Sequence, residues 1–197
     1  AVGYNSLAAN TTGDFNIGIG RSALANQTTS NHNTAVGWKS GEDITTGQQN
    51  TAIGSQALTN GTTAAQNVSI GAFSLDALTT GAYNVAVGNQ ALTAATTSSN
   101  NTAVGNLALG ANTTGSSNTA VGNNALDANT TADSNTAIGN VTLTANTTGA
   151  NNTALGAGAL SANTTASNNT ALGYEAMDQN TTGTQNVAVG ANALDAN

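Results

Sequence analysis

Apolar and polar residues follow one order along this chain, and the order repeats every seventeen residues without an insertion. Each unit begins with Asn, has a small residue at position three, Val, Ile or Leu at position four, and Gly at position five. A small residue follows at position eight, Leu stands at position nine in ten of twelve copies, and Thr-Thr fills positions thirteen and fourteen. Self-similarity at a fixed period is typical of a solenoid, in which each unit buries its apolar face against its neighbours.

Two positions of the unit do not vary. The glycine at position five is Gly3, Gly20, Gly37, Gly54, Gly71, Gly88, Gly105, Gly122, Gly139, Gly156, Gly173 and Gly190. The asparagine at position one is Asn16, Asn33, Asn50, Asn67, Asn84, Asn101, Asn118, Asn135, Asn152, Asn169 and Asn186. We expect the glycines to lie in turns, and the asparagines to form a structural ladder in which each amide bonds to the next coil.

The residue types favour strands over helices, because every complete unit contains glycine, Thr-Thr and asparagine, all poor helix formers. A β-branched residue before the glycine predicts one short strand, and alternation around the leucine predicts a second, with positions nine, eleven and thirteen inward. We therefore expect Leu126 and Val121 in the interior, together with one of the two threonine columns. The predicted fold is an all-β parallel β-solenoid or β-roll of about twelve 17-residue coils, with two short strands per coil, over residues 1–197 as a single repeat domain.

Position fifteen adds a second period. It is glycine in every other copy, at Gly13, Gly47, Gly81, Gly115, Gly149 and Gly183, and Ala or Ser between them. Two explanations remain open: the chain grew by duplication of paired coils, which we favour, or alternate copies occupy different environments.

The composition of the chain excludes some classes of function. Lys and Arg number two against nine Asp and Glu, for a net charge of −7, so the chain cannot neutralise nucleic-acid phosphates or dock on an anionic membrane. Cysteine is absent, and no apolar run approaches the roughly 20 residues of a membrane span. The chain starts and stops inside a copy, so we expect a fragment of a longer fibre.

Little in the sequence points to catalysis, a metal or a cofactor, and we expect none of the three. His32 is the only histidine and stands at a variable turn position. The acids at position ten, such as Asp127 and Asp178, are sparse and are interpreted as solubility groups. Asn-x-Thr sequons at position twelve, including Asn112 and Asn129, arise from the repeat itself and indicate glycosylation only weakly.

The third copy departs from the pattern. It replaces the leucine by glycine and brings Trp38, Lys39, Glu42 and Asp43 together. An exposed aromatic residue beside charges is typical of a recognition spot, whereas the alternative is a decayed coil in a long array.

The segment Gly115-Ser116-Ser117-Asn118-Thr119-Ala120-Val121-Gly122 resembles the YadA-like head repeats of trimeric autotransporter adhesins, and similar repeats occur in phage tail-fibre proteins. The resemblance covers the whole chain. It implies a left-handed parallel β-roll, a homotrimer, and display at a cell surface or virion surface, where the fibre binds host-surface or matrix molecules. The unit here is longer than the usual one of that family, and Asn stands where the family prefers Ser.

These observations predict a structural or adhesive module of an extracellular fibre. Small side chains at positions three and eight, such as Ala103 and Ala108, are expected to let copies pack side by side as a homotrimer. The alternatives are a subunit of a self-assembling extracellular filament, and an ice-binding β-solenoid that uses outward threonines such as Thr114 and Thr131.

Overall fold

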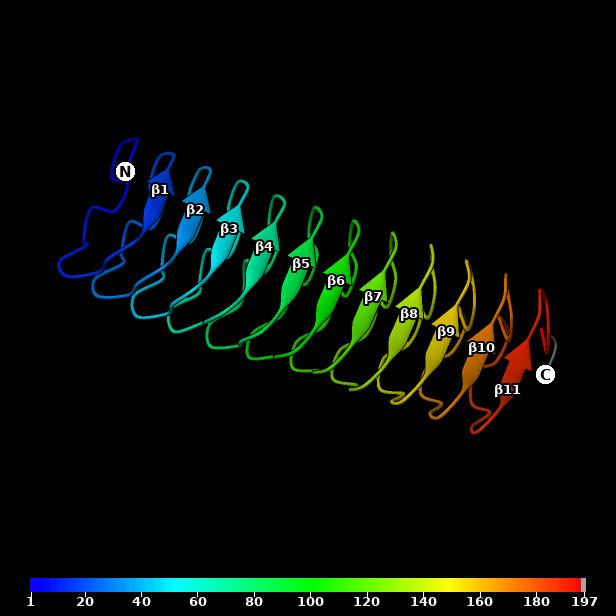
Figure 1. Cartoon of the computed structure of the whole chain (residues 1–197). Helices are drawn as coiled ribbons and strands as arrows, with labels where there is room; N and C mark the ends of the chain where they lie inside the picture. The colour runs from blue at the N-terminus through cyan, green and yellow to red at the C-terminus, as the bar shows by residue number, and fades with distance from the viewer. Residues whose placement is uncertain (196–197) are drawn as a thin grey trace.

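The structure, a computed structural model, describes residues 1–195 and contains one row of eleven short parallel strands (Figure 1). The strands are β1 (Ile17–Ile19), β2 (Thr34–Val36), β3 (Thr51–Ile53), β4 (Val68–Ile70), β5 (Val85–Val87), β6 (Thr102–Val104), β7 (Thr119–Val121), β8 (Thr136–Ile138), β9 (Thr153–Leu155), β10 (Thr170–Leu172) and β11 (Val187–Val189). Residues 1–195 contain no helix. The chain is an all-β parallel β-solenoid with a 17-residue repeat, as the sequence predicts.

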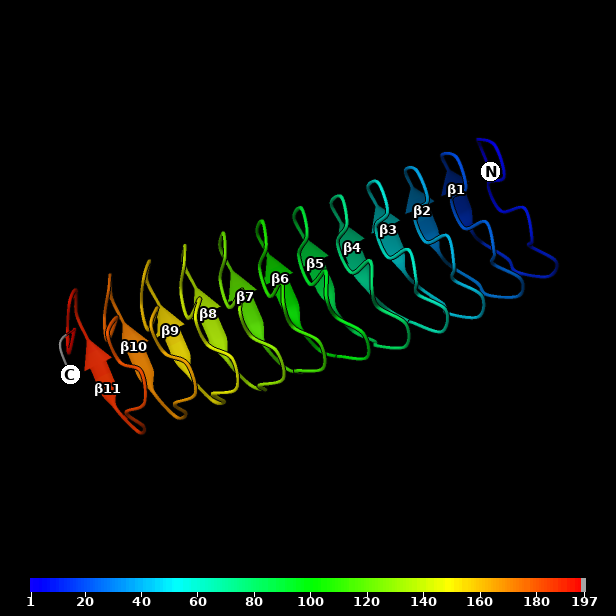
Figure 2. The ribbon, with the colours of Figure 1, turned by 180° about the vertical axis from the view of Figure 1, so that it is seen from behind.

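Each strand pairs only with the strands before and after it in the chain. The register moves by one whole unit, so that Thr102 lies beside Thr119, Ala103 beside Ala120, and Val104 beside Val121. Equivalent residues of successive coils therefore stand in columns along the rod. Figure 2 shows the opposite side, where the turn segments pass in front of the strands, so each coil is a flattened loop with the sheet on one side and turns on the other.

The structure forms one strand per unit, at positions two to four, where two were predicted. The rest of each unit is built from turns, with left-handed residues at positions seven, nine and seventeen, such as Asn124 (φ 53°), Leu126 (φ 53°) and Ser134 (φ 60°). Such conformations are costly for non-glycine residues and persist where the surroundings hold them in place. Here the Asn124 N–H donates to the Asn106 carbonyl of the preceding coil, and the Leu126 N–H to the Thr142 carbonyl of the following one, each at 3.0 Å.

Because the part of each unit around the leucine is not a strand, its side chains do not alternate strictly between inward and outward positions. Leu126 at position nine is buried as predicted, but position twelve is buried in place of positions eleven and thirteen. The threonine pair also differs from the prediction, since Thr113 is half-buried and Thr114 exposed, and neither column lies in the core. The Thr113 hydroxyl donates to the Thr130 carbonyl of the next coil at 3.0 Å.

The core lies between the sheet and the turn layer and is filled by positions three, eight and nine, with position twelve also buried. Ala120, Ala125 and Leu126 are fully buried in it, as are their equivalents in most coils. A Cβ built at Gly41, the glycine that replaces leucine in the third copy, would lie 3.7 Å from the Ala35 Cβ, so position nine packs directly against position three. Leucine from the turn side fills this space and leaves room only for a small residue on the strand.

The prediction that Val121 lies in the interior is therefore wrong. With Ala120 inward, its neighbours Thr119 and Val121 point outward, because successive side chains of a strand face opposite sides. The prediction for positions three and eight fails for the same reason: Ala103 and Ala108 are fully buried within their own chain and cannot form a contact between rods.

Glycine at position five follows every strand and is required there on two counts. Gly122 has φ 142°, a conformation that L side chains rarely adopt, and a Cβ on it would collide with the carbonyl oxygen of Gly139 in the next coil.

The alternating glycines at position fifteen are also sterically required. A Cβ at Gly47 would collide with the Ala64 carbonyl, and one at Gly149 with the Ala166 carbonyl. The 34-residue period thus has a structural component.

Candidate functional site

The invariant asparagines at position one form a buried ladder along the rod. The Asn118 backbone N–H donates to Asn101 Oδ1 of the preceding coil at 2.9 Å, and Asn118 Nδ2 donates to the Ala132 carbonyl of its own unit at 2.8 Å. Asn118 Oδ1 in turn accepts from the Asn135 backbone N–H of the following coil at 2.9 Å. Asn101 and Asn118 are fully buried. Each amide therefore ties its coil to both neighbours, which is a structural role, and a buried side chain of this kind cannot contact a ligand.

A second amide ladder occupies position twelve, which the sequence analysis noted only as a series of sequons. Asn129 Nδ2 donates to Asn112 Oδ1 at 2.9 Å and to the Ala132 carbonyl of its own unit at 3.1 Å. Asn112, Asn129, Asn146 and Asn163 are fully buried, so their amide nitrogens are inaccessible to a glycosylating enzyme in the folded chain. The recurrence of Asn in phase over successive copies was the signal that could have revealed this ladder.

In the third-copy spot Lys39 and Glu42 form an ion pair, and Asp43 is bonded to an amide of the preceding coil. Lys39 Nζ lies 3.0 Å from Glu42 Oε2 and 5.6 Å from the centre of the Trp38 ring. Asp43 accepts a hydrogen bond from Asn26 Nδ2 at 2.6 Å. Trp38 remains 45% exposed. The charged groups of the spot therefore already have partners, and Trp38 is its exposed residue.

The other aromatic and basic residues near this end also pack on each other. The Arg21 guanidinium lies 5.9 Å from the centre of the Tyr4 ring. The rings of Phe15 and His32 are stacked, with centroids 5.0 Å apart and an interplanar angle of 7°. His32 therefore has a structural neighbour at the surface, and residues 1–195 contain no group of three His, Cys, Asp or Glu side chains arranged to hold a metal ion.

A uniform surface runs along the outward side of the sheet, which sequence reasoning did not identify. We call positions two and four of β1 to β11 the outer sheet face. Its residues are only Thr, Val, Ile and Leu, with no charge and no amide. Position four carries an aliphatic side chain on every strand, and several remain well exposed, such as Ile138 at 37% and Leu155 at 41%.

The dimensions of this face follow from strand geometry. Three residues span about 10 Å, and eleven strands about 4.8 Å apart span about 50 Å, which gives a face of roughly 500 Å². The continuous apolar part is the position-four column, because position two is threonine on seven strands. The largest apolar patch on a monomeric soluble protein is typically about 300–600 Å² and often marks an interaction site. The outer sheet face is therefore the candidate functional surface.

No helix within residues 1–195 is long and apolar enough to cross a lipid bilayer. Comparison of the chain with protein-family models, curated proteins and solved structures found no match.

Proposed function

We propose that this chain is a structural and adhesive module of an extracellular fibre, and that it associates with copies of itself through the outer sheet face. In this proposal it is a rod of twelve left-handed coils in a homotrimer, which displays or spaces binding surfaces on a cell or virion. The observation that carries the proposal is the uncharged aliphatic column at position four on all eleven strands. The resemblance of the repeats to YadA-like heads supports the trimer and the location.

Copies of the same chain suit this face for two physical reasons. Each rod has the same spacing between strands, so the rows of side chains on the outer sheet face of one copy match those of another copy, coil by coil. Each chain also has a net charge of −7, and contact through a face without charges keeps the carboxylates of two copies away from the interface. Three chains around an axis form a closed assembly with cyclic symmetry.

The experiment is native mass spectrometry of the chain and of two double variants. We expect the parent to have three times the 19.1 kDa chain mass. Val104→Lys with Val121→Lys should yield monomer, because two charges on each chain would be buried in the interface. Thr97→Lys with Thr114→Lys, on the exposed threonine column, should remain trimeric. A folded parent monomer at micromolar concentration contradicts the proposal, and an open-ended series of masses indicates the filament instead.

Ice binding is the second candidate, because the outer sheet face also presents a regular two-column array. Position two is threonine on seven strands, for example Thr119 and Thr136, and stands beside the aliphatic column. This use needs the face exposed, so it is incompatible with its burial between copies. Thermal hysteresis in the parent, abolished by Thr119→Lys and retained in Thr114→Lys, would favour ice binding over the fibre; hysteresis lost in Thr114→Lys would assign it to the position-fourteen column.

A further inference from the structure

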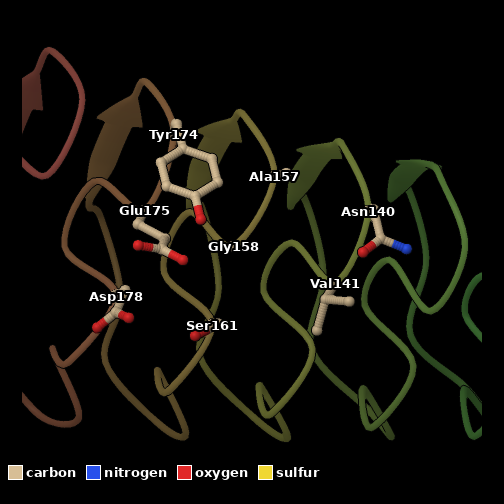
Figure 3. A pocket seen from close by; sticks show the side chains of 8 residues that line it. All are labelled: Asn140, Val141, Ala157, Gly158, Ser161, Tyr174, Glu175 and Asp178. Atoms are coloured by element: carbon tan, nitrogen blue, oxygen red, sulfur yellow. The ribbon is translucent and has the colours of Figure 1, made fainter.

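A notch opens in the turn edge of the rod beside β9, away from the outer sheet face. Positions six, seven and ten of successive units stand in columns along this edge. In the unit of β9 all three are small, at Ala157, Gly158 and Ser161, whereas the units on both sides carry larger side chains there. The gap has a volume of about 300 Å³, and we call it the β9 notch (Figure 3).

One wall of the β9 notch is acidic and aromatic. It consists of Tyr174, Glu175 and Asp178 from the unit of β10, and Figure 3 shows the Tyr174 side chain reaching from its own coil toward the coil of Gly158. A hydrogen bond to Glu175 raises the pKa of the Tyr174 phenol above its ordinary value, so that carboxylate lies beside the ring. Oδ1 of Asp178 is buried and has no hydrogen-bond partner in the described part of the chain, so a donor that reached it would satisfy an unpaired buried acceptor.

The opposite wall is less polar. Val141 and Asn140, from the unit of β8, supply an aliphatic surface and one amide. No basic residue lines the notch. The two basic side chains of the chain lie near its other end, where Lys39 pairs with Glu42 and Arg21 lies over Tyr4.

This arrangement selects the charge of a ligand. Two carboxylates without a cation repel an anion. They bind a neutral molecule weakly, because a neutral molecule leaves their negative charge uncompensated. A cation is favoured, and the geometry distinguishes between cations. A guanidinium is planar, stacks on an aromatic ring and bonds carboxylates through several N–H groups, whereas an ammonium is a strongly hydrated point charge.

We propose that the β9 notch binds the guanidinium of an arginine side chain presented by a partner protein. The guanidinium donates to Glu175 and Asp178 and stacks on Tyr174, and the aliphatic part of the arginine packs on Val141 and Ala157. The site does not depend on the self-association proposed above, since it uses the turn edge and not the outer sheet face.

The test is an NMR titration of the ¹⁵N-labelled full chain with a capped Gly-Arg-Gly peptide. Capped Gly-Lys-Gly and Gly-citrulline-Gly are the controls, the latter being a neutral analogue of the same shape. We expect the arginine peptide to shift the amides of the β9 notch with affinity on the order of millimolar, the lysine peptide to bind less tightly, and the citrulline peptide to leave them unchanged.

Variants locate the site. Glu175→Gln and Asp178→Asn should each weaken arginine-peptide binding by about three- to tenfold, since each removes one charged acceptor. Asp127→Asn, at the same position of the repeat as Asp178 but outside the notch, should leave it unchanged. Ala157→Tyr should abolish binding by filling the gap, and it should fold, because position six already carries Tyr174 in the next unit. Equal binding of the citrulline peptide, equal weakening by Asp127→Asn, or no shifts at all would overturn the proposal.

Discussion

The units of β2 to β5 and the units of β6 to β10 fill the same interior position in different ways. Position twelve is Ile44, Gly61, Leu78 and Ala95 in the first group, and Asn112, Asn129, Asn146, Asn163 and Asn180 in the second. All nine residues are buried. The first group stabilises its interior by apolar packing, whereas the second uses an amide ladder in which every Nδ2 from Asn129 onward donates to the Oδ1 of the coil before it.

The difference shows that the backbone register, and not the chemistry of this position, defines the coil. Both groups have the same strand positions and the same parallel register. The two ways of filling position twelve should nevertheless respond differently to mutation. An apolar interior loses packing when a side chain is shortened, while a ladder loses hydrogen bonds in neighbouring coils that are themselves unchanged.

The largest expected effect comes from placing the ladder residue in the apolar group. Leu78→Asn removes a fully buried leucine and inserts an amide between Gly61 and Ala95, which offer no side-chain partner. We expect a loss of about 3–5 kcal/mol in the free energy of unfolding. Urea unfolding measures it, with Leu78→Met as the matched control, for which less than about 1.5 kcal/mol should be lost. Equal losses would show that packing volume alone matters there.

The reverse exchange should cost somewhat less. Asn129→Leu leaves Asn112 Oδ1 without its donor and Asn146 Nδ2 without its acceptor, although both asparagines keep a bond to a carbonyl of their own unit. We expect a loss of about 2–3 kcal/mol in urea unfolding. The control is Asn123→Leu, in an exposed ladder where Asn123 Nδ2 donates to Asn106 Oδ1 at 3.1 Å; it should change stability by less than about 0.5 kcal/mol. If the two variants lose the same free energy of unfolding, burial does not strengthen the hydrogen bonds of the ladder.

The smallest expected effect concerns Asp127, on the surface of the coil that contains Asn129. Burial raises the pKa of this carboxyl above its ordinary value. The folded chain therefore holds the proton more tightly than the unfolded chain, so this group favours folding at low pH, and that contribution is lost as the pH rises through the folded pKa. Asp127→Asn should stabilise the chain by a few tenths of a kcal/mol at pH 7 and not at pH 3, after allowance for solvent screening. Thermal melts at both pH values test this, and a gain that is equal at both would exclude titration as its cause.

The sequence predicted the solenoid, the 17-residue register, the buried Leu126 column and the position of each three-residue strand, because these follow from periodic residue types. It did not predict which side of the strand faces inward. Val121 is the more apolar residue, yet Ala120 is buried, since Leu126 on the turn side already occupies the space between the layers. Apolarity alone cannot reveal that limit on volume.

The absence of a second strand was also beyond the sequence pattern. Asn124 and Ser134 stand at variable positions, as turn residues do. Leu126, however, is apolar, and nothing marks it as a left-handed residue except the bonds to adjacent coils that hold it. The β9 notch was missed for a similar reason. Ala157, Gly158 and Ser161 stand at variable positions, and only the fold shows that these positions share one edge.

The measurement that tests the central claim most directly is the accessibility of the outer sheet face in solution. The chain has no cysteine, so Leu155→Cys and Thr148→Cys each introduce one reactive thiol, the first on that face and the second on the exposed threonine column. Maleimide labelling should be slow at position 155 and fast at position 148, because copies of the chain cover the face, and dilution or urea should abolish the difference. Equally fast labelling at both positions in the undiluted, folded protein would contradict self-association through the outer sheet face.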